Sequence, residues 1–279
     1  MTRDALASHA YWDQWIEHSQ KRIETMWAKS KEPSSDPRYR PQYLFEIAKE
    51  YWQLMFERYS RGDSVSELVQ YFPGLLDAWE DSERLGTTVF SSEQQVSRRS
   101  WTKNLDKYIV CFWLTGLALA LDIPDDQWNR LTALMGNEGE DVLLDRIISS
   151  RDHGRRIGTV LCHPKPYARL LDAINARPPD QPHILRKFVE NWYAELDRPS
   201  KKGGVTAIFD RPYWYGFDEF IEGGAYFGFW CVEAVAAVKA FQLDDSLCLG
   251  SPHYPGDLLR PGGPTACDVE GVSEADKAV

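Results

Sequence analysis

The chain has 279 residues, a formal net charge of −10 and 43% hydrophobic residues. This length can bury a large core and allows either one large domain or two smaller ones. The surplus of acidic residues argues against direct binding of nucleic acid, whose phosphates would be repelled, and favours a basic partner. It is concentrated at residues 213–279, which carry 11 acidic and 3 basic residues, whereas the rest of the chain has a net charge of only −2.

The cysteines and the apolar segments indicate where the protein resides. The five cysteines are odd in number and widely spaced, which predicts free thiols in a reducing compartment. The first 15 residues contain no apolar core of the signal-peptide type. The longest apolar run, 109–121, has 13 residues, fewer than the roughly 20 that a membrane helix needs. We therefore expect a cytoplasmic protein with no membrane partner.

Helical periodicity dominates the chain, and few segments alternate as strands do, so we predict an all-α, multi-helix fold. The first clear amphipathic helix covers residues 43–59 and should end at Gly62, which can adopt the left-handed conformation of a helix C-terminus. Ser64 and Glu67 have the spacing of a capping box that starts a further helix, which Pro73 should interrupt.

The central part of the chain also shows helix-start signals. Ser92 and Gln95 predict the beginning of a long helix that ends near Leu121, and Pro124 should restart the chain as a new helix. Further amphipathic helices are predicted within residues 138–150 and 184–196.

The last part of the chain begins with a predicted loop at residues 198–212 and a long helix from Tyr213. Gly224 and Gly228 are four residues apart and should open a smooth face on that helix. The order of residue types around Phe229-Trp230 repeats the order around Phe112-Trp113, which suggests two related halves. We predict an N-terminal domain at residues 1–122, a C-terminal domain at 123–260 and a flexible acidic tail at 261–279.

Two acidic clusters resemble the magnesium-binding aspartates of all-helical isoprenoid enzymes. The first lacks the third acid of the DDxxD pattern, because Gln127, Trp128 and Asn129 follow Asp126. Helix capping explains both clusters better, and no zinc motif or catalytic motif is present. We expect no metal, no cofactor and no enzymatic activity. The carboxylates concerned are Asp122, Asp125, Asp126, Asp244 and Asp245.

Aromatic and acidic residues are dense at the start of the last predicted helix. Rings can supply buried anchors in a protein interface, and carboxylates can steer a basic partner and fix its register. We predict that this region contacts a basic protein, together with Asp244 and Asp245. The residues at the helix start are Tyr213, Trp214, Tyr215, Asp218, Glu219 and Glu222.

Residues 226–258 resemble the C-terminal signature of the PoNi-type immunity proteins, which protect bacteria against polymorphic nuclease toxins. The signature combines an aromatic-rich helix containing Glu233-Ala234, the triplet Asp244-Asp245-Ser246, and Tyr-Pro-x-Asp-Leu at residues 254–258. Phe229 stands where tyrosine is usual, and Gly256 where a basic residue is common. A looser similarity covers the N-terminal half at Tyr39, residues 59–62 and Trp79-Glu80.

The resemblance implies an all-helical protein that binds a cognate toxin in the producing cell's cytoplasm and has no catalytic activity. Its motif residues should be structural, and Glu233, placed in an apolar helix, needs a partner such as an arginine. The motif residues are Trp230, Glu233, Tyr254, Pro255 and Asp257.

The sequence therefore predicts an immunity protein that neutralises a nuclease (DNase) toxin by covering its active site or its DNA-binding surface. Two alternatives stay open. One is a magnesium-dependent, all-helical enzyme of the isoprenoid type. The other is a scaffold or homodimer whose aromatic face serves self-association.

Overall fold

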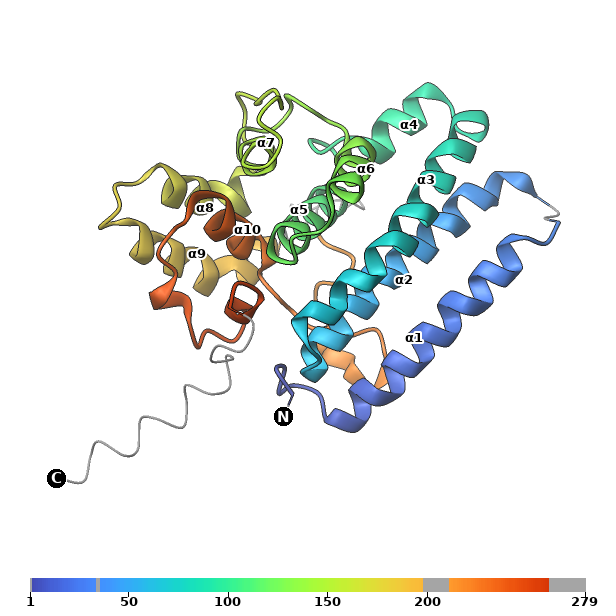
Figure 1. Ribbon diagram of the computed structural model, residues 1–279, viewed down its shortest axis with the longest axis horizontal. Helices are drawn as coiled ribbons and strands as arrows, with labels where there is room; N and C mark the ends of the chain where they lie inside the picture. The colour runs from blue at the N-terminus through green and yellow to red at the C-terminus, as the bar shows by residue number, and fades with distance from the viewer. Residues whose placement is uncertain (1, 34–35, 198–210, 261–279) are drawn as a thin grey trace, which may run out of the picture. The chain divides into compact units, whose positions relative to one another are not determined.

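The computed structural model describes residues 2–33, 36–197 and 211–260, and these form helices and turns without a strand (Figure 1). The all-α prediction is thus confirmed. The chain folds into two compact units that interleave along the sequence. The first unit comprises Met1–Arg99, Ile123–Gly136 and Gly216–Gly228, and the second comprises Ser100–Asp122, Asn137–Tyr215 and Phe229–Val279. The domain limits at residues 122 and 260 stay predictions.

The first unit is built around α2 (Arg40–Arg61), which lies between α1 (His9–Ser30) and α3 (Phe72–Val89) and packs against both (Figure 1). A further helix, α6 (Asp125–Met135), packs against α3. The remaining elements of this unit are η1 (Pro37–Tyr39), η2 (Val65–Tyr71), α4 (Ser92–Arg99) and the short 3₁₀ segment η3 (Phe217–Gly223).

The ends of α2 and α6 follow the local sequence signals. Gly62 has φ of 109°, and its amide satisfies the carbonyls of Arg58 and Tyr59, as expected for a left-handed helix end. Pro124 occupies the N-cap position of α6, and Asp125 lies in its first turn, where a carboxylate is stabilised by the helix dipole. Both predicted boundaries are confirmed.

Other predicted boundaries are wrong by a turn or more. Pro73 does not interrupt a helix, because it lies in the first turn of α3, where its missing amide costs no hydrogen bond. The predicted long helix over residues 92–121 is two helices, α4 and α5 (Leu105–Ala120). Asn104 starts the second by accepting a hydrogen bond from the Lys107 amide at 3.0 Å.

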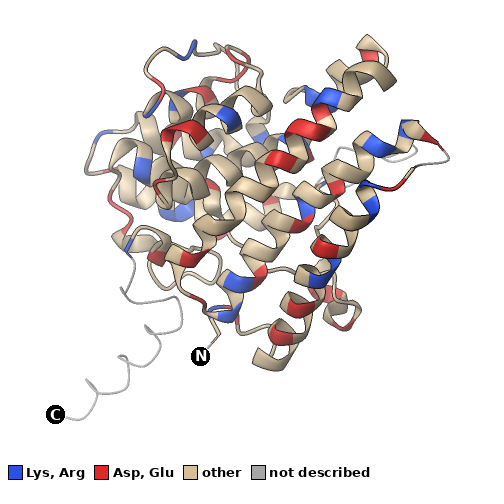
Figure 2. Cartoon of the chain, turned by 45° about the vertical axis from the view of Figure 1, so that its right-hand side comes forward, with Lys and Arg blue, Asp and Glu red and all other residues tan. Residues whose placement is uncertain are grey.

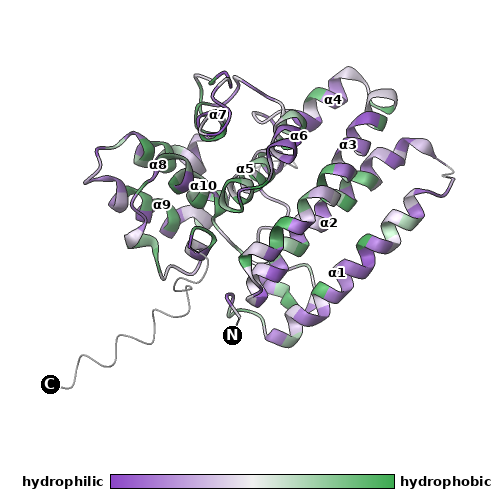
Figure 3. Ribbon diagram, in the orientation of Figure 1, coloured by the Kyte–Doolittle hydropathy of each residue, from purple (hydrophilic) through white to green (hydrophobic). Residues whose placement is uncertain are grey.

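The second unit places α5 beside α10 (Val232–Phe241), and both helices are hydrophobic along most of their length (Figure 3). A side chain at Gly116 would lie 2.6 Å from Cγ1 of Val232, so the absence of a Cβ allows this close approach. Phe112-Trp113 lies within α5, whereas Phe229-Trp230 precedes the start of α10; both segments belong to this unit. The other elements are α7 (Val142–Ser149), α8 (Pro164–Asn175), α9 (Gln181–Leu196), η4 (Ser246–Cys248) and η5 (Gly256–Leu258).

The predicted long helix from Tyr213 is wrong, because α10 begins only at Val232. Gly216, Gly224 and Gly228 have φ of 85°, 72° and 96°, values that a right-handed helix cannot contain. The expected smooth helical face at Gly224 and Gly228 is therefore absent. The predicted tail at 261–279 and most of the predicted loop, residues 198–210, lie outside the described residues.

Candidate protein-contact surface

The most exposed large apolar side chain in the described part of the chain is Phe220, with 78% of its surface accessible. It lies in η3, where its φ of −138° and ψ of 57° break the helical turn. Glu219 and Glu222 are exposed beside it in sequence, and Asp218 is half-buried. We name Asp218, Glu219, Phe220 and Glu222 the acidic turn.

Tight packing on α1 fixes the C-terminal end of the acidic turn. Gly224 adopts φ of 72°, and a Cβ there would lie 1.9 Å from the Trp15 ring. Only glycine satisfies both the backbone conformation and this contact. Trp15 therefore holds the end of the turn against the helix.

The residues after Gly224 are tied to the first unit by buried hydrogen bonds. The hydroxyl of Tyr226 donates to Oδ2 of Asp4 at 2.5 Å, and the hydroxyl of Tyr11 donates to the Tyr226 carbonyl at 2.8 Å. Burial, followed by the negative charge of Asp4, raises the pKa of Tyr226 far above its ordinary value, so the phenol stays a donor. This buried anchoring gives the acidic turn a defined position.

The other predicted aromatic contacts belong to the second unit and are less accessible. Trp214 is only 1% exposed and packs against Trp113 and Trp192, with ring centroids at 5.1 Å and 5.9 Å. Tyr213 and Tyr215 are half-buried. Trp214 is therefore part of a core, which argues against its predicted use as an interface anchor.

The two predicted acids Asp244 and Asp245 have different surroundings. Asp244 is exposed and accepts a hydrogen bond from the Ser246 amide at 2.9 Å, which holds the pKa of this carboxyl below its ordinary value. Asp245 is 2% exposed and accepts hydrogen bonds from Tyr254 and from Arg260, whose Nη1 lies 2.9 Å from Oδ2. Asp245 therefore stabilises the C-terminal segment. Of these two acids, Asp244 is the one that is accessible to a partner.

Glu233 is fully buried in α10, and aromatic residues supply its partners. Oε1 accepts hydrogen bonds from the Tyr167 hydroxyl at 3.0 Å and from Nε1 of Trp192 at 3.1 Å. Burial raises the pKa of this carboxyl to about 7, although these donors oppose the shift. The expectation that an arginine pairs with Glu233 is wrong. The other motif residues, Trp230, Tyr254, Pro255 and Asp257, are also buried.

Burial reduces the negative charge that the residues after 212 present at the surface. Glu233, Asp245 and Asp257 are each at most 5% exposed, so they add little to the surface charge. Basic and acidic residues are interspersed over α1, α2 and α3 (Figure 2). In the described part of residues 213–260, the accessible negative charge is that of the acidic turn and Asp244.

The carboxylates considered for magnesium are not assembled into a centre. Asp125 and Asp126 are exposed in the first turn of α6. Within the described residues, no group of three or more His, Cys, Asp or Glu side chains is placed to hold a metal ion. None of the described helices has both the length and the hydrophobicity needed to cross a bilayer.

The four described cysteines, Cys111, Cys162, Cys231 and Cys248, are free, and Cys267 lies outside the described residues.

Sequence reasoning missed Phe220. In the string Phe217-Asp-Glu-Phe220-Ile-Glu-Gly223, an aromatic every third residue suggests one buried helical face. The available signal was the pair of flanking glycines, Gly216 and Gly224, which make a short turn between them more favourable than a helix.

The described part of the chain is all-α and presents an acidic turn with an exposed aromatic ring. The N-terminal model of the PoNe immunity proteins (PoNi) matches residues 3–133, and the C-terminal model of the same proteins matches residues 139–258. The chain therefore belongs to the PoNe immunity protein family, which confirms the resemblance seen in the sequence. Membership implies that the partner is a toxin protein.

Solved structures include one that is similar over nearly the whole chain. Protein PA2201 from Pseudomonas aeruginosa has a TM-score of 0.67 and 18% sequence identity, with 97% of this chain and 92% of that chain covered. At this identity, the similarity establishes a common fold. No curated protein matches the chain.

Proposed function

We propose that this protein binds a cognate DNase toxin of the PoNe class in the cytoplasm of the producing bacterium and neutralises it stoichiometrically. Family membership over residues 3–258 carries this proposal. The chain contributes no catalytic step, because occupation of the toxin surface is sufficient for protection.

The acidic turn is the contact segment. A DNase needs a basic surface to hold the phosphates of its substrate. The carboxylates of Asp218, Glu219 and Glu222 meet this surface and speed association through electrostatic steering. DNA and the acidic turn then compete for the same cations, so the DNA-binding surface is the part of the toxin that is covered.

Phe220 is the apolar anchor within this contact. Large aromatic side chains provide much of the binding energy in protein interfaces when a partner pocket excludes water from them. A ring that is 78% exposed in the free protein has most of its surface left to bury. The packing of Gly224 on Trp15 keeps the turn in place before the toxin arrives, which lowers the entropy lost on binding.

Two variants separate the roles of charge and ring. The amide triple variant Asp218→Asn/Glu219→Gln/Glu222→Gln should bind the toxin's nuclease domain with slower association and a weaker salt dependence. Phe220→Ala should mainly speed dissociation, with affinity about 10- to 30-fold weaker. Surface plasmon resonance at several salt concentrations measures both rates.

A triple amide variant elsewhere on the first unit controls for net charge: Glu24→Gln/Glu93→Gln/Asp126→Asn changes three exposed acids. It should retain nearly normal kinetics. Co-expression should protect cells from the cognate toxin, and Phe220→Ala should reduce that protection. If the wild-type protein did not bind the toxin's nuclease domain, the proposed function would be refuted. Normal kinetics in both acidic-turn variants would instead place the interface elsewhere.

A further inference from the structure

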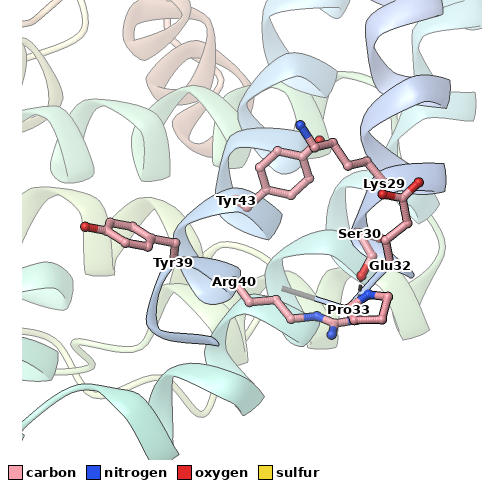
Figure 4. Close-up of a pocket in the computed structure, with 7 residues that line it drawn as sticks. All are labelled: Lys29, Ser30, Glu32, Pro33, Tyr39, Arg40 and Tyr43. Carbon is pink, nitrogen blue, oxygen red and sulfur yellow. Dashed lines mark hydrogen bonds between the residues drawn. The ribbon is translucent and has the colours of Figure 1, made fainter. Parts of the chain in front are cut away.

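A groove lined by basic residues lies between α1 and α2 of the first unit. Its charge is opposite to that of the acidic turn. One end is a pocket of about 250 Å³ lined in part by Lys29, Arg40 and Tyr43 (Figure 4). A second pocket of about 560 Å³ shares Lys29 and Tyr43 with the first and continues past Lys21 and Arg22. We name Lys21, Arg22, Lys29, Arg40 and Tyr43 the basic groove.

The basic side chains of this groove differ in whether they already interact with other residues of the protein. Arg22 is paired with Glu50 at 3.0 Å, and Arg40 donates to the Ser30 carbonyl (Figure 4). Lys21 and Lys29 are exposed and form no ion pair with any described residue. These two ammonium groups therefore remain available to an anion.

Helical geometry places these lysines in one line. Lys21, Thr25 and Lys29 follow one another at intervals of four residues. The two lysines therefore lie on the same side of α1. Their Cα atoms are therefore about 12 Å apart along the helix axis. Among the described residues, Glu32 is the single acidic side chain in the lining of either pocket. An elongated anionic segment fits such a line better than one small ion does.

We infer that the basic groove binds an acidic segment of the same toxin, an inference that rests on the proposed function. The overall charge of −10 repels a long polyanion such as DNA, whereas a protein can offer a short acidic segment beside a basic surface. Charge complementarity therefore favours a polypeptide as the occupant.

One partner can reach both charged sites. Trp15, which packs against Gly224 just after the acidic turn, precedes Lys21 and Lys29 on α1 by about 10 to 20 Å along the helix. A standard interface of about 800 Å² per partner spans such a distance. A toxin must then present a basic and an acidic patch in the matching order, which excludes nucleases that are merely basic.

Charge reversal in the groove tests this inference. Lys21→Glu/Lys29→Glu should weaken binding of the toxin's nuclease domain about tenfold or more, since like charges would face each other. Lys21→Arg/Lys29→Arg should bind normally. The control variant Lys187→Glu/Lys239→Glu makes the same change in net charge at two exposed lysines of the second unit and should also bind normally. Thermal melting verifies that each variant is folded.

A complementary change on the toxin completes the test. Reversal of individual acidic residues on the toxin should identify a Glu→Lys or Asp→Lys variant that restores binding to Lys21→Glu/Lys29→Glu. Wild-type affinity in the folded groove variant would overturn the inference while leaving toxin neutralisation intact. Binding of a short DNA duplex that is lost in this variant, with toxin binding unchanged, would also overturn it. If the wild-type protein failed to bind the toxin, the proposed function itself would fail.

Discussion

Glu57 should make the stability of this protein fall as the pH rises. Its side chain is buried in the first unit, where the Ser19 hydroxyl donates to Oε1 at 3.2 Å. Oε2 has no hydrogen-bond partner among the described residues. Burial raises the pKa of Glu57 from 4.5 to about 8, and the charge of Glu50 adds to the shift.

The direction of the pH effect follows from the raised pKa. The folded state holds the proton more tightly than the unfolded state, so the full contribution to stability is present below pH 4.5. It is lost as the pH rises through 8. A difference between pKa values of 4.5 and about 8 corresponds to about 5 kcal/mol, or about 1.4 kcal/mol per pH unit in that window. This is an upper value, because relaxation and entering water reduce the cost of a buried charge.

Glu57→Gln should remove this pH dependence, because the amide oxygen can still accept the Ser19 hydrogen bond and carries no proton that titrates. Urea unfolding at pH 5.5 and pH 8.5 measures the effect. Between these values the wild-type protein should lose up to about 3 kcal/mol more than the variant. Glu24→Gln, at an exposed position of α1, should follow the wild-type profile. Parallel pH profiles for wild type and Glu57→Gln would refute the argument.

Two further substitutions test the packing beneath the surface. Gly224→Ala should destabilise the protein by about 2 kcal/mol or more, because alanine disfavours φ of 72° and its Cβ would overlap Trp15. Gly223→Ala has open space around its Cβ and is the matched control in thermal melting; equal melting temperatures would contradict the role of Gly224. Trp192→Phe should cost about 1–3 kcal/mol in urea unfolding, because Glu233 loses a buried donor at 3.1 Å, and unchanged stability would show that this hydrogen bond contributes nothing.

Local sequence signals predicted the helical class and several helix ends. Gly62 ends α2 and Pro124 starts α6 because their backbone restrictions act within a few residues. The family resemblance at residues 226–258 was equally visible, since it depends on the order of unlike residues. The same signals failed between Ser100 and Asn104, where the chain leaves a helix and starts another.

The candidate surface was predicted only in part. Glu219, Glu222 and Asp244 are exposed and Asp218 is half-buried, and contact of these acids with a partner stays a prediction. Trp214 and Asp245 are buried, and no local pattern distinguishes them from exposed neighbours. Their burial depends on residues distant in sequence, such as Trp113 for Trp214.

The sequence by itself determined that this protein is helical, acidic and a member of an immunity family, because periodicity, charge and motif order are properties of the chain. Only the tertiary structure decided that Phe220 is exposed, that Glu233 relies on Tyr167 and Trp192, and that two lysines line a groove. Exposure and buried pairing arise when segments far apart in sequence pack together. They are therefore set by the whole fold.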